Sequence, residues 1–292
     1  MSRIVVLGDL NLDVYAKQPT HLDLGSEFRG AVWAAPGGSA GTFARVAADE
    51  GASVTFIGCV GDDLIGDLLV RSLEESGVRP HVGRADLPSG TILALEQGTE
   101  CAMVCSRGAN DGLTADSVEE AYFENVDHLH VSGYAFLSRP QRGAARRAIV
   151  LAHAHGASIS VDPPPANLIE RFGVASFLEE LAEVAWIFPN LAEGQTLSEL
   201  EDPKEIVDSL ADRFLTGALT LGPAGALVWR GPERNLQHPP RTALGDSTGA
   251  GDAFAAAFSV ALLGGKGLPD ANARGCEVAA SRIRGGDDPR AG

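Results

Sequence analysis

The chain has 292 residues, enough to bury a sizeable core without disulfides or a structural metal. Apolar residues make up 45% of it and charged residues 21%, a globular composition that excludes disordered, fibrous and membrane classes. The 23 Lys and Arg against 39 Asp and Glu give a formal net charge of -16. A field of this sign argues against nucleic acid as the main partner, whereas a small phosphate ligand at a helix N-terminus remains compatible with it.

The N-terminal residues and the cysteines bear on location. Only a short apolar run precedes Asp9, too short for the apolar core of a signal peptide, and no run of about 18 apolar residues suggests a membrane span. The four cysteines, at positions 59, 101, 105 and 276, lack zinc-site spacing and are expected to be free thiols. The sequence therefore predicts a soluble, cytoplasmic protein with no membrane partner.

Short apolar runs that end at Gly or Asp alternate with helical patterns along the chain. The runs are RIVVLGD, SVTFIGCVGDD, VDHLHVSGY, ASISVDPPP, VAWIFPN and GALTLG, and the helical stretches are 40–51, 65–77, 141–156, 204–213 and 251–263. Buried strands that alternate with helices are typical of a parallel sheet covered by helices. We therefore predict an α/β fold in which residues 1–292 form a single domain.

Two segments interrupt this alternation, residues 15–35 and residues 80–107. Both are rich in strand-forming residues, and in the second the run TILALEQGTECAMVC alternates around a turn at 97–99. Strands that leave an α/β body near the carboxyl ends of its sheet are well placed to close over a pocket. We predict that the two segments form a small β lid; a surface hairpin without a closing role is the alternative.

The segment LGDSTGAGDAFAAAF, residues 244–258, carries the strongest signal for chemistry. Gly249, Ala250 and Gly251 lead directly into an Ala-rich helix, so free amides and the positive end of the helix dipole converge on a spot that suits an anion. Asp252 follows in the first turn, where a carboxylate can accept a proton from a nearby hydroxyl. We expect a base beside an anion hole; a plain helix cap is the alternative.

This segment, DSTGAGD followed by AFAAAF, closely resembles the C-terminal signature of the ribokinase family, also called the PfkB carbohydrate kinases. Residues 36–78 resemble the family's N-terminal signature, and GDLNLDV, RGAN, HVSGY, SVDPPP, PNLAE and TLGPAGALV follow the family's order. The resemblance covers nearly the whole chain. It implies a ribokinase-like three-layer sandwich with a central, mainly parallel sheet and a β lid, and transfer of the ATP γ-phosphoryl group to a sugar-type hydroxyl.

The resemblance also implies roles for the motifs that handle phosphate. Asp252 would deprotonate the acceptor hydroxyl, while the amides of Ala250, Gly251 and Asp252 would stabilise charge on the transferring phosphoryl group. In PNLAE, Asn190 and Glu193 match the motif that works near Mg²⁺ and the phosphates, largely through water. A capped helix start is the alternative for this pair.

Asp9, Asn11 and Asp13 lie where the family binds acceptor hydroxyls. Their alternating spacing puts them on one face of an extended segment, and carboxylates and amides suit sugar hydroxyls. A solvated turn is the alternative. Gly37 and Gly38 match the family's di-glycine switch, which lets backbone approach the acceptor and hinges the lid.

The nucleotide is expected at the other end of the site. Thr220, Gly222 and Gly225, in TLGPAG, match the family's strand-to-turn segment beneath the nucleotide. Cys276 falls where many members have Asn near the adenine. Thr42 replaces the Asn of the N-terminal signature, so this acceptor-binding position also departs from the family's pattern.

One further expectation follows from the resemblance. Asp246 and Thr248 fit the segment where the family often binds a monovalent cation such as K⁺. A homodimer is compatible with the sequence, which does not fix the oligomeric state.

His128 and His130 alternate on one strand, and we expect them in the core and assign them no catalytic role.

The leading hypothesis is an ATP- and Mg²⁺-dependent kinase of a neutral sugar or a nucleoside. Residues 9–13 and 37–42 contain no Lys or Arg, whereas an acceptor that already carries phosphate usually needs a cation. A sugar phosphate kinase is the alternative within this class, with Arg29 and Arg107 as available cations, and Arg107 is counted among the acceptor-binding residues. Outside this class stand a non-catalytic sugar-binding relative and an NAD-dependent dehydrogenase, although the chain lacks the dehydrogenase GxGxxG signature.

Overall fold

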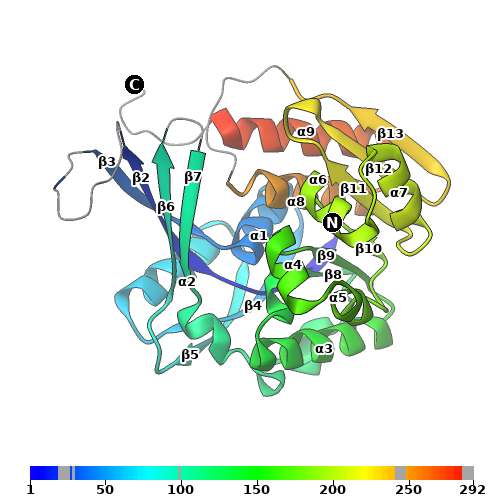
Figure 1. Ribbon diagram of the computed structural model, residues 1–292. Coiled ribbons are helices and arrows are strands. Elements are labelled where there is room, and N and C mark those ends of the chain that lie inside the picture. The colour runs from blue at the N-terminus through cyan, green and yellow to red at the C-terminus, as the bar shows by residue number, and fades with distance from the viewer. Residues whose placement is uncertain (19–26, 28–29, 98–99, 241–247, 285–292) are drawn as a thin grey trace.

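The computed structural model describes residues 1–18, 27, 30–97, 100–240 and 248–284. Its main feature is a large sheet that is parallel from β5 to β11 and antiparallel at β12 and β13 (Figure 1). The strand order across this sheet is β13 (Glu233–Gln237), β12 (Ala226–Arg230), β11 (Thr216–Thr220), β10 (Trp186–Ile187), β9 (Ser158–Asp162), β8 (His128–Ser132), β1 (Arg3–Leu7), β4 (Ser53–Gly61), β5 (Arg79–Ala85).

Helices cover both faces of this sheet, because its central strands are apolar on both sides. In β1, Ile4 and Val6 pack into one core while Val5 and Leu7 pack into the other. The first core contains α1 (Ser39–Asp49), α2 (Leu64–Glu75), α8 (Ala250–Leu263) and α9 (Leu268–Arg284). The second contains α3 (Arg139–Ala154), α4 (Ala166–Phe172), α5 (Val174–Glu180), α6 (Leu191–Ser198) and α7 (Pro203–Ala211). The predicted three-layer α/β fold is confirmed.

Short 3-10 turns connect several of these elements. They are η1 (Gly108–Gly112), η2 (Ala115–Ser117), η3 (Glu120–Phe123), η4 (Gly133–Phe136) and η5 (Gly222–Ala224). In the described part of the chain, no helix combines the length and the apolar character needed to cross a bilayer.

A second sheet stands apart from the body at the left of Figure 1, and we call it the lid sheet. Its strand order is β3 (Ala31–Gly37), β2 (Asn11–Gln18), β6 (Gly90–Gln97), β7 (Glu100–Ser106). Gln97 pairs with Glu100, as the predicted turn requires.

The predicted bounds of the lid differ from the observed lid sheet, which already begins at Asn11, and they were wrong for residues 80–85. Residues 80–85 belong to β5, which pairs in parallel with β4 at the edge of the large sheet. The segment RPHVGRA is polar and largely accessible, as an edge strand can be, and Pro80 is tolerated there because it need not donate a ladder hydrogen bond. Its composition therefore hid a strand that completes an ordinary βαβ unit with β4 and α2.

The chain reverses its direction of travel across the large sheet at β1. It runs outward from β1 to β4 and β5 and then returns to β8, which lies on the other side of β1. In open α/β sheets, ligands bind at the carboxyl ends of the strands beside such a switch point. Here those ends lead to Asp9 after β1 and to Ser132 at the end of β8.

The two histidines of β8 are buried in the core, as expected. The His128 ring nitrogens lie 2.7 Å from the hydroxyls of Ser158 and Ser160, and His130 Nδ1 lies 2.8 Å from Ser160. The His130 ring stacks on Phe43 with centroids 3.6 Å apart. Burial lowers the pKa of His128 to about 3 and lowers that of His130 well below its usual range. Both imidazoles are therefore neutral at physiological pH.

These depressed pKa values predict a loss of stability in acid. A histidine that is neutral when folded stabilises the fold fully above its unfolded pKa of about 6.5, and this stability is lost as the pH falls toward the folded value. The native protein's free energy of unfolding should therefore exceed that of His128→Asn by a margin that shrinks by about 1.4 kcal/mol per pH unit below about pH 6. Urea unfolding of both proteins at several pH values measures this. A difference that does not change with pH would contradict a neutral His128.

Candidate active site

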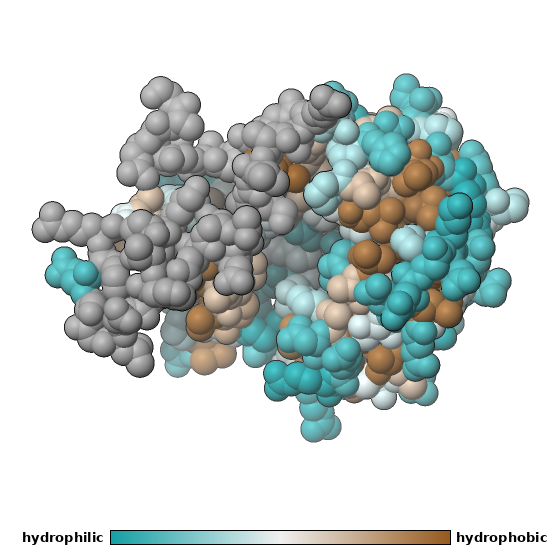
Figure 2. Space-filling view, turned by 45° about the horizontal axis from the view of Figure 1, so that its top comes forward, coloured by the Kyte–Doolittle hydropathy of each residue, from teal (hydrophilic) through white to brown (hydrophobic). Residues whose placement is uncertain are grey.

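A cavity of about 760 Å³ opens between the lid sheet and the carboxyl edge of the large sheet. Figure 2 shows the recess between the lid on the left and the main body on the right. The cavity brings together most of the residues predicted from the sequence. Those that line it are Asp9, Asn11, Asp13, Gly38, Thr42, Arg107, Asn190, Glu193, Thr220, Thr248, Gly249, Gly251 and Asp252.

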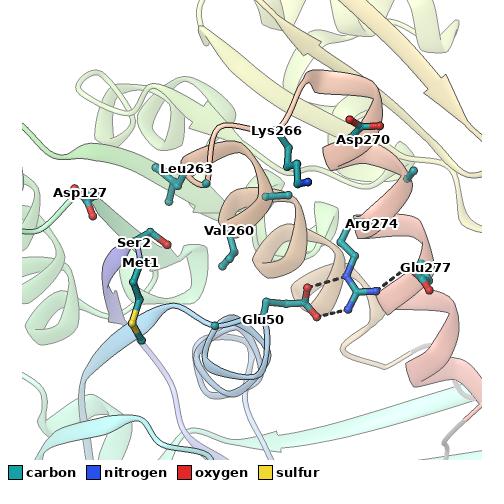
Figure 3. A pocket seen from close by; sticks show the side chains of 14 residues that line it. Met1, Ser2, Glu50, Asp127, Val260, Leu263, Lys266, Asp270, Arg274 and Glu277 are labelled. Atoms are coloured by element: carbon teal, nitrogen blue, oxygen red, sulfur yellow. Dashed lines mark hydrogen bonds and ion pairs between the residues drawn. The ribbon is translucent and has the colours of Figure 1, made fainter.

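A second hollow, of about 910 Å³, lies at the opposite, amino-terminal edge of the large sheet (Figure 3). Its most prominent side chain is Arg274, whose guanidinium pairs with Glu50 at 2.7 Å and with Glu277 at 2.7 Å. Its cation is thus neutralised by neighbours, and none of the predicted site residues lines this hollow. We therefore place the candidate active site in the smaller cavity.

Asp9 anchors the floor of the cavity. Its carboxylate accepts hydrogen bonds from the Ser132 hydroxyl at 2.8 Å, the Ser39 amide at 3.0 Å and the Asn11 side chain at 3.2 Å. Asn11 in turn accepts a bond of 2.7 Å from Asn110. The polar groups of Asp9 and Asn11 are therefore largely occupied by protein partners, and they join the carboxyl ends of β1 and β8.

Asp13 differs from Asp9 and Asn11 in keeping an unused acceptor. It is 7% exposed, and its Oδ1 atom is buried without a hydrogen-bond partner among the described residues. Burial raises its pKa to about 7, and the nearby charge of Asp9 adds to the effect. A buried polar atom without a partner is costly, so this oxygen is the group best suited to a ligand hydroxyl.

The two glycines at the end of β3 are required by close packing. A Cβ atom on Gly37 would lie 1.9 Å from Asp13 Oδ2. Gly38 has φ of 83° and caps α1, and a Cβ there would lie 2.7 Å from the Asp9 carbonyl oxygen. The backbone thus passes directly against both acidic residues, as the di-glycine motif predicts. The hinge role of this motif stays a prediction.

The helix α8 begins at the cavity wall. Gly249 has φ of 73°, a left-handed conformation, and Ala250 is the first helical residue. Asp252 lies in the first turn, where Ser39 and Asp162 are close enough to its side chain to lower its pKa against the effect of burial. The free amides of this helix start and the Asp252 carboxyl therefore border the same space, as the sequence predicts.

The carboxyl groups of Asp162 and Asp252 form a hydrogen-bonded pair. Burial raises the pKa of Asp252 to about 6 and raises that of Asp162 well above its usual range, where the charges of Asp252 and Glu193 add to the shift. Two carboxyls can share a hydrogen bond only if one of them holds a proton. The pair therefore carries a proton in the ligand-free protein near neutral pH.

Asn190 and Glu193 cap α6. The Asn190 side chain accepts from the Glu193 amide at 3.0 Å, and the Glu193 carboxylate accepts from the Asn190 amide at 2.9 Å and from its side chain at 2.6 Å. The alternative of a capped helix start is thus correct, and it does not exclude a ligand role because both residues also line the cavity. Burial raises the pKa of Glu193 to about 8.

Several predicted residues lie elsewhere. Gly222 and Gly225 form a turn after β11 with φ of 56° and 100°, and neither lines the cavity. Cys276 is buried in the core, with its thiol near the carbonyl oxygen of Gln237, and burial raises its pKa to about 11. Asp246 lies outside the described residues, as does Arg29.

Three arginines approach the cavity, and two of them were not expected. Arg107 is held by Asp111 at 2.9 Å and by Gln141. Arg45 donates to the Pro36 carbonyl oxygen at 2.9 Å while its Nη1 atom is buried without a partner among the described residues, and burial lowers its pKa to about 10. Arg282 lines the cavity beside the helix start of α8.

Sequence reasoning also missed two polar contributors. Asp162 belongs to the motif SVDPPP, and a carboxylate that directly follows a buried strand at a switch point is itself a signal that could have found it. Asn110 belongs to RGAN, and it holds Asn11 and accepts from the Leu10 amide at 2.9 Å. No local pattern reveals this role of Asn110, because Leu10 and Asn11, which it contacts in the site, are about 100 residues away in sequence.

Gly251 offers a test of the helix start. Its φ is not positive, and a Cβ there would meet nothing within 4 Å, so a side chain enters the cavity and not the protein. We expect Gly251→Val to fold normally and to lower turnover at least about tenfold, because it fills the space proposed for phosphate. Gly143→Val is the control. Gly143 lies in α3, and a Cβ atom there would contact only Ala115, at an ordinary distance of 3.9 Å. Steady-state kinetics and thermal unfolding of both variants test this; a fully active Gly251→Val protein contradicts the assignment.

Comparison with known proteins identifies the family. Residues 1–286 match the pfkB family carbohydrate kinases, which covers almost all of the chain. The chain belongs to this family. PfkB carbohydrate kinases are phosphotransferases with an alcohol group as acceptor, so the chain is a kinase of the sugar and nucleoside class.

Individual PfkB relatives differ in their acceptors. The chain is 32% identical to an ATP-dependent ribose-1-phosphate kinase of Halopiger xanaduensis over 76% of this chain and 71% of the relative. It is 28% identical to a ribokinase of Haemophilus influenzae over 96% and 92%. Among solved structures, adenosine kinase from Sinorhizobium meliloti superimposes with a TM-score of 0.86 at 25% identity, covering 97% of this chain and 93% of the other.

Proposed function

We propose that this PfkB kinase transfers the γ-phosphoryl group of ATP to a hydroxyl of a neutral sugar or a nucleoside. Asp252 serves as the base, and the amides of residues 250–252 form the anion hole. The observation that carries the proposal is the convergence of three features on one cavity. These are the unpaired oxygen of Asp13, the Asp252 carboxyl and the N-terminus of α8.

Each feature contributes one part of the chemistry. Asp13 accepts a hydrogen bond from the acceptor and thereby orients it. Asp252 takes the proton of the reacting hydroxyl while the oxygen of that hydroxyl bonds to phosphorus. The pKa of Asp252, about 6, leaves this carboxylate ionised near neutral pH. The amides at the start of α8 stabilise the charge on the transferring group. When bound, ATP with Mg²⁺ supplies the phosphoryl group, and ADP leaves.

The residues present fit a divalent cation. Asp162, Glu193 and Asp252 all have raised pKa values, which reflects several buried carboxyls with too little positive charge nearby. Oxygen donors that retain water suit Mg²⁺, and Asn190 and Glu193 would hold it through water. We also propose a K⁺ site near Thr248 and Asp246; exchanging K⁺ for Na⁺ in the assay should lower turnover, and unchanged turnover would refute this site.

A coupled assay of ADP release, run on a panel of sugars, nucleosides and sugar phosphates with MgATP, tests the function. Phosphorylation of a neutral acceptor supports the proposal. Calorimetric binding of a sugar with no phosphoryl transfer at saturating MgATP would instead make the chain a non-catalytic relative.

A sugar phosphate is the second candidate acceptor, and one observation favours it. Arg282 lines the cavity and, among the described residues, has neither a hydrogen bond nor an ion pair. Its guanidinium could meet a phosphate group on the acceptor, as an arginine commonly does. Exclusive use of sugar phosphates in the assay panel would select this candidate over the neutral one.

We further propose a homodimer through the outer face of the lid sheet. One rung across its four strands consists of Ala34, Val14, Leu93 and Val104, all apolar. Val104 is 63% exposed, and Val32 on the same face is 68% exposed. An exposed apolar sheet face can pair with its own copy about a twofold axis. Light scattering should give a dimer that Val104→Asp converts to a monomer; a monomeric native protein refutes this proposal.

The free thiols of Cys59, Cys105 and Cys276 suit the cytoplasm.

A further inference from the structure

The active-site cavity has a polar end and an apolar end. The polar end is the floor that carries Asp9, Asn11 and Asp13. The apolar end lies between the inner face of the lid sheet and the opposite wall of the body. Its lining residues are Tyr15, Ile92, Met103 and Cys105 on the lid, and Tyr134, Leu137, Pro165 and Leu168 on the body. A free sugar, which carries hydroxyls around most of its ring, matches this second end poorly.

The strand register fixes the distance between the two ends. Asp13 pairs with Ile92, and Ile92 pairs with Cys105, so these three form one rung on the inner face. The next rung outward carries Tyr15 and Met103, two residues farther along each strand. Two residues of strand advance about 7 Å. A ligand group that contacts the outer rung therefore lies about one sugar ring away from the hydroxyl held by Asp13.

The outer rung is apolar, and it is accessible at Met103, whereas Tyr15 is only 8% exposed and Ala94 between them is buried. Met103 is 51% exposed although its side chain faces the cavity, so its apolar surface stays in contact with water in the ligand-free protein. Tyr15 stacks on Trp33 with ring centroids 5.3 Å apart and an interplanar angle of 11°, which extends the wall with aromatic surface. Covering such surface with an apolar, planar group is favourable, whereas covering it with hydroxyls is not.

We propose that the acceptor is a nucleoside, with its sugar held at Asp13 and its base inserted between the lid residues Tyr15 and Met103 and the body residues Leu137 and Leu168. This inference rests on the proposed kinase function and narrows its acceptor. The base supplies a flat, largely apolar group that covers the apolar side chains at the second end of the cavity. The sugar supplies the hydroxyls that the floor requires.

The first test compares acceptors that share one sugar. Ribose, adenosine, guanosine, cytidine and uridine are assayed for ADP release with MgATP on the native protein. We expect kcat/KM for at least one nucleoside to exceed that for ribose by about 100-fold or more, because the base adds contacts that ribose cannot make. Equal use of ribose, or a preference for ribose or a sugar phosphate, overturns the nucleoside inference and leaves a kinase. Failure of every acceptor in the wider panel overturns the proposed function itself.

The second test locates the base. Met103→Ser replaces an accessible side chain, so the fold should tolerate it, and we expect KM for the preferred nucleoside to rise roughly tenfold while KM for ATP is unchanged. Leu236→Ser is the control, because Leu236 is a similarly accessible strand residue, 49% exposed, on β13 and outside the cavity. An unchanged nucleoside KM in Met103→Ser would show that the base does not lie against the lid and overturn its placement.

Discussion

Replacing Asp252 by Asn should lower turnover by about 10²-fold or more, with little change in stability or in the Michaelis constants. Asparagine keeps the size of the side chain and can still form hydrogen bonds with the neighbouring Asp162, but it cannot take up the proton of the acceptor hydroxyl. Steady-state kinetics with saturating ATP and acceptor gives the loss, and urea unfolding gives the stability.

A matched control separates base catalysis from helix capping. Asp270 lies in the first turn of α9, so Asp270→Asn removes the same favourable charge from a helix N-terminus that is outside the active-site cavity. This control should keep native turnover. If Asp252→Asn loses less than about tenfold in turnover, Asp252 acts only on the start of its helix.

Replacing Asp13 by Ala should raise the Michaelis constant of the acceptor by about tenfold to 100-fold and leave that of ATP nearly unchanged. Among Asp9, Asn11 and Asp13, only Asp13 has a buried acceptor oxygen without a hydrogen-bond partner in the described part of the protein. A hydrogen bond of this kind contributes roughly 1–3 kcal/mol, with the upper values reached when the Asp13 carboxyl is ionised. Kinetics with each substrate varied in turn measures both constants.

A deoxy analogue of the acceptor provides the internal control for Asp13. The native protein should lose roughly 1–3 kcal/mol of binding for each hydroxyl that the analogue lacks. Asp13→Ala should no longer distinguish the analogue from the full acceptor at the hydroxyl that Asp13 contacts. Discrimination that survives in Asp13→Ala would place the contact at Asp9 or Asn11 instead.

The fold was largely predictable because its signal is local and repeated. Most buried strands of the large sheet are short, mainly apolar runs, and β1, β4 and β9 lead to Gly or Asp at the carboxyl edge. Residues 80–85 were misassigned because an edge strand is covered on fewer sides and carries no such run. Their place depends on pairing with β4, which only the assembled sheet provides.

The site was predictable where chemistry depends on neighbours in sequence. The helix start at Gly249 and the alternation from Asp9 to Asp13 are patterns of this kind. Asp162 and Arg282 were missed because their importance arises from approach in space, to Asp252 and to the start of α8. Likewise, no pattern indicates that Asp9 is occupied by Ser132 whereas Asp13 is not, since this depends on the distance between β1 and β8.

The proton shared by Asp162 and Asp252 has a consequence for the molecule as a whole. The formal charge of -16 assumes that every carboxyl is ionised at pH 7. In the folded chain, however, Asp13 and Glu193 have pKa values of about 7 and about 8, and the Asp162 and Asp252 pair holds a proton as well. Unfolded, these groups titrate near pH 4 and are fully ionised. The chain therefore takes up protons from solution when it folds at neutral pH, and the native protein is less acidic than its composition implies.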